Sequence, residues 1–152
     1  MYIFMNFFQL GVEAVSDQHI ANTAYGYTGS TSWSYASTRR TGRDTYKCNI
    51  FVAEVLKEAG ATVPHRYPRW IRWSPIPASQ WANPYSSYLT SDSCWTNRNS
   101  AAVGYVIAGG GHMGIVTGYH QTTSAGTDEI LTNDWGFRDN QGYSVTFWDY
   151  TC

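Results

Sequence analysis

One cysteine and one histidine in this chain lie in sequence contexts that suit acyl transfer. Cys48 falls at the start of residues 46–60, the clearest helical pattern in the sequence. The first turn of a helix presents unpaired backbone N–H groups and the positive end of the helix dipole, which stabilise a thiolate. His112 follows three glycines and begins a short apolar run that predicts a β-strand. Because glycines let a backbone approach a ligand closely, His112 is a candidate base.

A cysteine nucleophile and a histidine base need a third polar residue that orients the imidazole ring. Asn133 and Asp134 lie at the end of an apolar run that we expect to form a hairpin with the strand begun by His112. Successive residues of a strand point to opposite faces, so only one of the two meets the ring. We favour Asp134, because a carboxylate also stabilises the imidazolium, whereas Asn133 would only fix the ring. The alternative is that Cys48 is simply a buried apolar residue.

The other two cysteines are candidates for a disulfide. Cys94 lies in a polar loop and Cys152 is the last residue, so a bridge would tie the tail to that loop. Such a bridge implies an oxidising compartment and leaves Cys48 free. The remaining histidines have no cysteine or carboxylate pattern around them, so we expect no metal site and no cofactor.

Length and composition narrow the classes of function. At 152 residues the chain fits a single catalytic domain, 1–152, that can bury a core. The net charge is −1 and only 14% of residues are charged, so we expect neither nucleic acid nor a membrane as partner. We also expect the protein to be a monomer. Aromatic residues reach 16%, which suits a surface that binds peptides or sugars and equally a β-rich core.

The expected elements are helices first and strands afterwards. Residues 1–15 are apolar without a basic start, and are either a leader remnant or an N-terminal helix packed on the core, which we favour. Ser16 caps a short helix, and Asp44 or Thr45 caps the helix of Cys48, which Gly60 ends. Such an order indicates an α+β fold, with the cysteine helix packed on an antiparallel sheet of about four to six strands.

Four runs carry the strand signal, at 102–108, 113–120, 129–133 and 143–148. The segment 124–128 is the turn that we expect to join the second and third of them in a hairpin. Between the helices and these runs, residues 64–84 hold all five prolines of the chain together with several arginines and tryptophans. Proline at that density predicts an irregular loop.

Two segments resemble the signature motifs of NlpC-like and CHAP-type cell-wall peptidases. Cys48, followed by Asn49, Phe51 and Val52, is similar to their helix-start motif Asp-Cys-Ser-Gly-Phe-Val, and 112–118 is similar to their histidine strand, His-Val-Gly-Ile-Val. The order of cysteine helix, histidine strand and third polar residue also matches. The resemblance implies a papain-like cysteine peptidase that hydrolyses peptide bonds of bacterial peptidoglycan without a metal or cofactor.

The small size and the segment 32–35 upstream of Cys48 look most like the second family of type VI secretion amidase effectors and the domesticated amidase effectors of ticks. This resemblance implies a secreted or periplasm-delivered antibacterial toxin that cuts the cross-link between diaminopimelate and D-alanine, with an immunity protein as partner in a bacterial source. The substrate-binding residues expected on this basis are Trp33, Tyr35, Arg43, Asp44, Lys47, Asn49 and Gly111.

Two departures from the motif concern substrate recognition. Lys47 replaces the aspartate before the cysteine and Asn49 replaces the serine after it. Asp44 or the arginines at 39, 40 and 43 are then expected to recognise the charged ends of the stem peptide, and Lys47 would itself favour a thiolate. Two rival functions remain: a non-catalytic module that binds peptidoglycan or glycan, and an acyltransferase that uses an amine acceptor in place of water.

Overall fold

The structure, a computed structural model, describes residues 14–152. The leader or N-terminal helix expected at 1–15 therefore lies almost entirely outside the described residues. Within them the chain forms four helices, which are α2 (Asp17–Tyr25), α3 (Cys48–Glu58), α4 (Ala78–Trp81) and α5 (Ser87–Thr90). The strands are β1 (Trp95–Arg98), β2 (Val106–Gly109), β3 (His112–Gly118), β4 (Gln121–Ala125), β5 (Ile130–Asn133) and β6 (Thr146–Tyr150).

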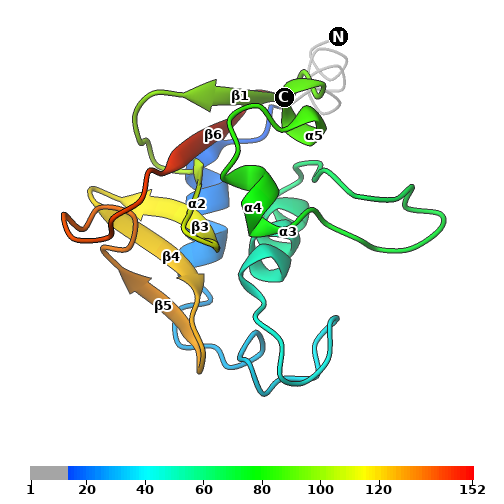
Figure 1. The fold of residues 1–152 in the computed structure, drawn as a ribbon, viewed down its shortest axis with the longest axis vertical. Coiled ribbons are helices and arrows are strands. Elements are labelled where there is room, and N and C mark those ends of the chain that lie inside the picture. The colour runs from blue at the N-terminus through cyan, green and yellow to red at the C-terminus, as the bar shows by residue number, and fades with distance from the viewer. Residues whose placement is uncertain (1–13) are drawn as a thin grey trace, which may run out of the picture.

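All six strands belong to one antiparallel sheet with the order β1-β6-β2-β3-β4-β5 (Figure 1). The helices α2 and α3 pack on each other and against β3 and β4. Their apolar residues form one core with the sheet, in which Phe51 and Leu56 of α3 meet Met113 and Ile115 of β3. The expected α+β class and antiparallel sheet are confirmed.

The two long helices differ in how they begin. Ser16 caps α2 as expected, since its Oγ accepts a hydrogen bond from the N–H of His19 at 3.2 Å. The expected cap of α3 by Asp44 or Thr45 is wrong, because Lys47 is the N-cap residue and no side chain closes that end. The first backbone N–H groups of α3 are thus left for another partner. Gly60 follows the end of α3 with a positive φ of 94°, as a glycine after a helix often does.

Strand β4 was not expected, and it changes the topology. Its sequence, Gln-Thr-Thr-Ser-Ala, is polar and lacks the apolar alternation of a half-buried strand. It pairs with β3 on one side and with β5 on the other. The predicted hairpin between 113–120 and 129–133 is therefore wrong, because β4 lies between those two segments and Tyr119 and His120 make the turn that follows β3.

The proline-rich segment is irregular over most of its length, with one exception. The short helix α4 begins directly after Pro77, where a proline's fixed φ and missing N–H cost a helix nothing. The rest of the segment forms a long loop, which protrudes at the right in Figure 1 and is closed by a single bridge between His65 and Pro75.

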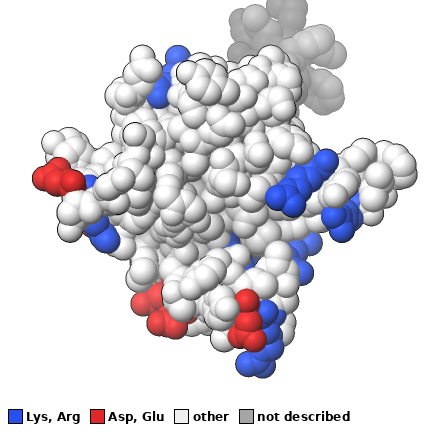
Figure 2. All heavy atoms as spheres, in the orientation of Figure 1, with Lys and Arg blue, Asp and Glu red and all other residues white. Residues whose placement is uncertain are grey.

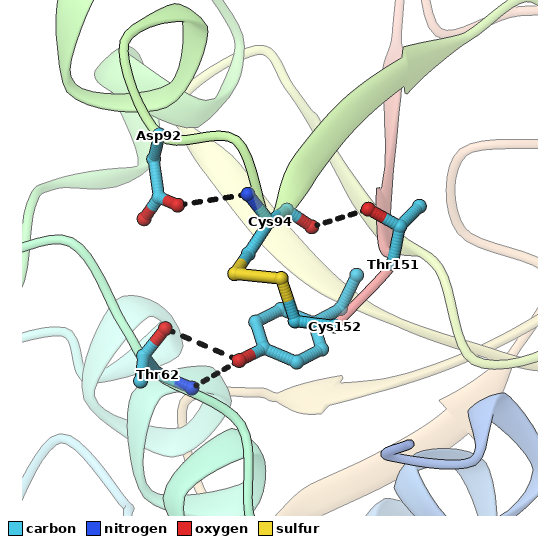
Figure 3. The surroundings of a disulfide bond; sticks show 6 residues. Thr62, Asp92, Cys94, Thr151 and Cys152 are labelled. Atoms are coloured by element: carbon cyan, nitrogen blue, oxygen red, sulfur yellow. Dashed lines mark hydrogen bonds between the residues drawn. A yellow bond between two sulfur atoms is a disulfide. The ribbon is translucent and has the colours of Figure 1, made fainter.

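The predicted disulfide between Cys94 and Cys152 is confirmed. It joins the chain end to the residue before β1, and Figure 3 shows the hydrogen bonds around it. Thr151 donates to the carbonyl of Cys94 through its backbone N–H at 2.7 Å and its hydroxyl at 3.1 Å. The bridge and these bonds fix the C-terminal tail beside β1, and Cys48 remains the one free cysteine of the described residues.

Candidate active site

Cys48 is the first residue of α3, and its side chain is only 7% exposed. The backbone N–H groups of Met113, of Asn49 and of Cys48 itself are placed to donate to its sulfur. Burial raises the pKa of the Cys48 thiol, and these three donors offset only part of that effect. At neutral pH the resting sulfur is therefore a thiol, whereas the helix position and Lys47 led us to expect a thiolate.

The donor from Met113 is the contact that joins the two halves of the site. Met113 follows His112 directly on β3, so the sulfur at the start of α3 lies against the backbone of the histidine strand. The apolar side chain of Met113 is fully buried in the core that α3 shares with the sheet. Packing of α3 on β3 thus brings Cys48 to the end of the strand where His112 lies.

A hairpin turn and close contacts within the protein account for the glycines before His112. Gly109 pairs with His112 across a two-residue hairpin turn, in which Gly110 and Gly111 both have positive φ. A Cβ on Gly109 would lie 2.6 Å from the carbonyl oxygen of Ser144, and one on Gly110 would meet the ring of Tyr143 at 2.6 Å. Gly111 alone of the three faces open space, so it is the one with room for a ligand beside it.

The imidazole of His112 is held by two groups on other segments. Its Nε2 lies 2.9 Å from the Oγ of Ser124 on β4, and the ring packs at right angles against Trp135, with 4.7 Å between ring centroids. Burial lowers the pKa of His112 to about 4. The ring is therefore neutral at neutral pH and can accept a proton there.

Asn133 and Asp134, the expected orienting residues, have other partners. The Oδ1 of Asn133 accepts the backbone N–H of Trp135 at 3.0 Å, in the tight turn that follows β5. Asp134 is exposed and pairs with Arg138 at 2.5 Å, which lowers the pKa of its carboxyl. The group that holds His112 is Ser124 instead, because β4 and not β5 is the neighbour of β3. A clue in the sequence was the threonine pair before Ser124, since threonine favours strands.

Lys47 does not face a substrate surface. Its side chain is buried, and its ammonium donates to the carbonyl oxygens of Ser34, Gly42 and Thr45 at 2.9 to 3.1 Å and to the Thr45 hydroxyl. Burial lowers the pKa of Lys47, with an opposing effect from Asp44. The expected substrate contact of Lys47 is therefore wrong, and the residue instead organises the loop 34–45 that leads into α3.

The remaining expected binding residues are spread over several environments. Trp33 is buried against Phe51 and Tyr27, and it lines a pocket beside Arg39 and Glu54 rather than the cleft next to Asn49. Tyr35 is half-buried and packs on Tyr46, with 4.8 Å between ring centroids. Arg43 and Asp44 are exposed on the loop before α3, and Asp44 has a positive φ of 61°.

Asn49 lies at the edge of a cleft of about 500 Å³ beside the first turn of α3. Its Nδ2 donates to the carbonyl of Ile76 at 3.3 Å, which fastens the proline-rich segment to the helix. The other walls are formed by residues 40–41 of the preceding loop and, from the proline-rich segment, by Arg66, residues 72–75 and Pro77. The cleft therefore begins at the residue after the candidate nucleophile.

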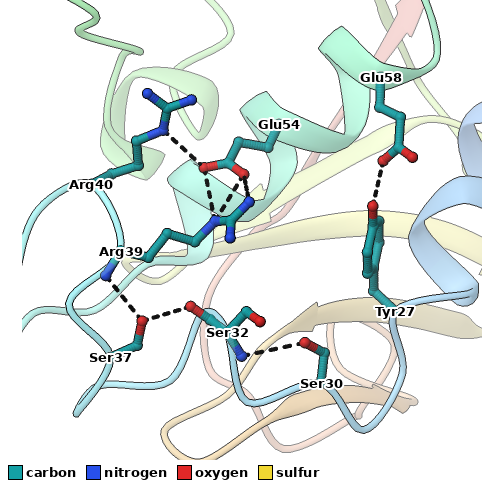
Figure 4. A network of polar contacts seen from close by, with 8 residues as sticks. All are labelled: Tyr27, Ser30, Ser32, Ser37, Arg39, Arg40, Glu54 and Glu58. Atoms are coloured by element: carbon teal, nitrogen blue, oxygen red, sulfur yellow. Dashed lines mark hydrogen bonds and ion pairs between the residues drawn. The ribbon is translucent and has the colours of Figure 1, made fainter.

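A polar network holds one wall of this cleft in place (Figure 4). Glu54 of α3 accepts hydrogen bonds from Arg39, at 2.9 Å from its Nε, and from Arg40, at 3.2 Å. The guanidinium of Arg40 also lies 4.3 Å from the ring centre of Trp73. Arg40 thus links α3 to the proline-rich segment across the cleft, and Arg39 covers Trp33 at 4.4 Å.

Searches against protein-family models, curated proteins and solved structures found no match to this chain. Among residues 14–152, no group of three histidine, cysteine or acidic side chains is arranged to hold a metal ion. Over the same residues, no helix has the length and apolar character needed to cross a membrane.

Proposed function

We propose that this protein is a papain-like cysteine peptidase that cleaves peptide bonds in the stem peptides or cross-links of bacterial peptidoglycan. The observation that carries the proposal is the packing of α3, which begins at Cys48, against β3, which begins at His112. It brings a thiol at a helix N-terminus to the strand whose first residue, His112, holds a neutral imidazole. A thiol and a base on two packed elements are the minimum required for acyl transfer.

In the proposed mechanism, the Nε2 of His112 carries the N–H and donates it to the Oγ of Ser124, so that Nδ1 is the basic nitrogen. Nδ1 takes the thiol proton as the sulfur attacks the scissile carbonyl. The backbone N–H of Cys48 stabilises the oxyanion, and the imidazolium then gives its proton to the leaving amine. Water, activated by the same imidazole, releases the acyl group. Both groups are neutral at rest, so charge develops only during the reaction.

The preferred bond, diaminopimelate to D-alanine, and the antibacterial role follow from the motif resemblance around Cys48 and His112. The disulfide between Cys94 and Cys152 supports a protein that is secreted or delivered to the periplasm, because such bridges persist in oxidising compartments. If the source is bacterial, an immunity protein is the expected partner. The proposed mechanism uses no cofactor.

A second candidate, a non-catalytic peptidoglycan-binding module, is favoured by the burial of Cys48 and by the raised pKa of its thiol. Digestion of purified peptidoglycan separates the two. We expect wild-type protein to release fragments whose masses identify the bond, and Cys48→Ala and His112→Ala to release none. His19→Ala, at an exposed histidine of α2, is the matched control. Digestion by Cys48→Ala at the wild-type rate, or binding without digestion by all four proteins, would overturn the peptidase proposal.

A further inference from the structure

The cleft beside Cys48 carries a concentration of positive charge that the chain as a whole does not have. Three arginines line it, Arg40, Arg66 and Arg72, whereas none of the acidic residues within 14–152 does. The net charge of the whole chain is −1. Figure 2 shows basic side chains and no acidic ones on the visible face of the protruding proline-rich loop. Such a local excess of arginine attracts anionic groups.

Two of the three guanidinium groups have no carboxylate partner among the described residues. Arg40 shares Glu54 with Arg39, whereas neither Arg66 nor Arg72 forms an ion pair with any residue of 14–152. Arg72 instead lies over the ring of Tyr67, 4.3 Å from its centre. Their charge is therefore available to a ligand, and arginine is suited to bind a carboxylate with two parallel hydrogen bonds.

The walls of the cleft are held from several sides. Arg40 is fixed between Glu54 and Trp73, and Asn49 holds the segment at Ile76. At the other end of the loop, the backbone N–H of Arg66 donates to the carbonyl of Ser74 at 2.8 Å. Arginines on a fixed frame lose less conformational freedom when a ligand binds than arginines on a free loop.

We propose that the cleft formed by Arg40, Arg66 and Arg72 is a subsite for a free carboxylate of the peptide substrate. Asn49 and Ile50, which line the cleft, follow Cys48 directly on α3, so the subsite lies beside the first turn of the cysteine helix. The substrate is thus an anionic peptide, and its amidated form is a poor ligand. This inference rests on the proposed function for the identity of the bond that is cut, but not for the binding itself.

Binding to the Cys48→Ala protein tests the subsite without turnover. The probes are one synthetic stem tetrapeptide of peptidoglycan with free carboxylates and the same peptide with every carboxyl amidated, measured by titration calorimetry. We expect the free acid to bind about tenfold more tightly than the amide, and Arg66→Gln or Arg72→Gln to remove about tenfold of its affinity. The affinity of the free acid should also fall as salt is added.

Arg69→Gln is the matched control, since Arg69 lies on the same loop and does not line the cleft. It removes the same charge and should change the affinity by less than about twofold. Equal affinities for the acid and the amide, or equal losses in Arg66→Gln, Arg72→Gln and Arg69→Gln, would overturn the subsite. Hydrolysis of peptidoglycan by wild-type protein is a separate measurement, so loss of the peptidase proposal and loss of the subsite are distinguishable.

Discussion

The Nε2 of His112 lies 2.9 Å from the Oγ of Ser124, across the β3–β4 ladder. A serine hydroxyl can hold the ring in place, but unlike a carboxylate it carries no charge to stabilise an imidazolium. Burial therefore acts unopposed and lowers the pKa of His112 to about 4. The pair describes a base that is held in place and weak, which accords with a thiol that stays protonated at rest.

The first prediction concerns Ser124 as a positioning residue. Ser124→Ala frees the imidazole ring, and we expect kcat/KM for peptidoglycan fragments to fall by about 10²-fold, with KM little changed. Thr123→Val is the control, because it removes a buried hydroxyl of β4 that bonds to Thr117 and Thr132 and not to His112. Equal losses of kcat/KM in both variants would mean that the serine acts only through stability.

The second prediction concerns acid stability. His112 has a folded-state pKa of about 4, below its ordinary value of 6.5. Because the unfolded chain binds this proton more readily than the folded one, the contribution of His112 to the free energy of unfolding is fully present above pH 6.5. It is lost as the pH falls toward 4. It amounts to about 3 kcal/mol. We expect this contribution of His112 to the free energy of urea unfolding to decrease as the pH falls over this range.

His112→Gln provides the comparison for that measurement. Burial, with Asp149 beside it, raises the pKa of Asp17 to about 6, so Asp17 acts in the opposite direction over much of the same range. The difference between wild-type and His112→Gln proteins isolates the histidine, and it should shrink as the pH falls from 6.5 to 4. A difference independent of pH would contradict the lowered pKa of His112.

The third prediction concerns the reactivity of the Cys48 thiol. Because burial raises its pKa, less thiolate is present at neutral pH than in a model thiol, and the sulfur is also shielded. We expect iodoacetamide to label Cys48 in the folded protein more slowly than it labels free cysteine, and at a similar rate in urea. Labelling of folded protein faster than of free cysteine would show that the resting sulfur is a thiolate.

The fourth prediction concerns Lys47. Lys47→Met keeps the length of the side chain but leaves the carbonyls of Ser34, Gly42 and Thr45 without their donor. We expect a loss of about 2–4 kcal/mol in the free energy of unfolding, measured in urea. Lys47→Asp, which restores the acid of the peptidase motif, should destabilise more, because it places a carboxylate among carbonyl oxygens.

The control for this pair is Lys57→Met, at an exposed lysine of the last turn of α3. It should change the unfolding free energy by less than about 0.5 kcal/mol. If Lys47→Asp were as stable as wild type, the ammonium would not be what holds the loop, and the motif position would tolerate either charge.

Local sequence signals determined where several elements begin and what lies at their ends. A serine before a helical pattern caps α2, and an apolar stripe ended by Gly60 gives α3 with Cys48 at its start. Two positive-φ glycines force the turn that makes His112 the first residue of β3. Each of these follows from interactions within a few residues, so the sequence alone suffices to predict them.

Contacts between distant segments decided the rest. Because β4 pairs between β3 and β5, His112 has a serine as its partner in place of Asp134. A polar segment such as β4 becomes a strand only when its neighbours pair with its backbone N–H and C=O groups, and its own sequence does not reveal that pairing. Burial of Lys47 depends on three carbonyls supplied by the folded loop 34–45. The arginine cleft likewise exists only because α3, the loop before it and the proline-rich segment meet in space.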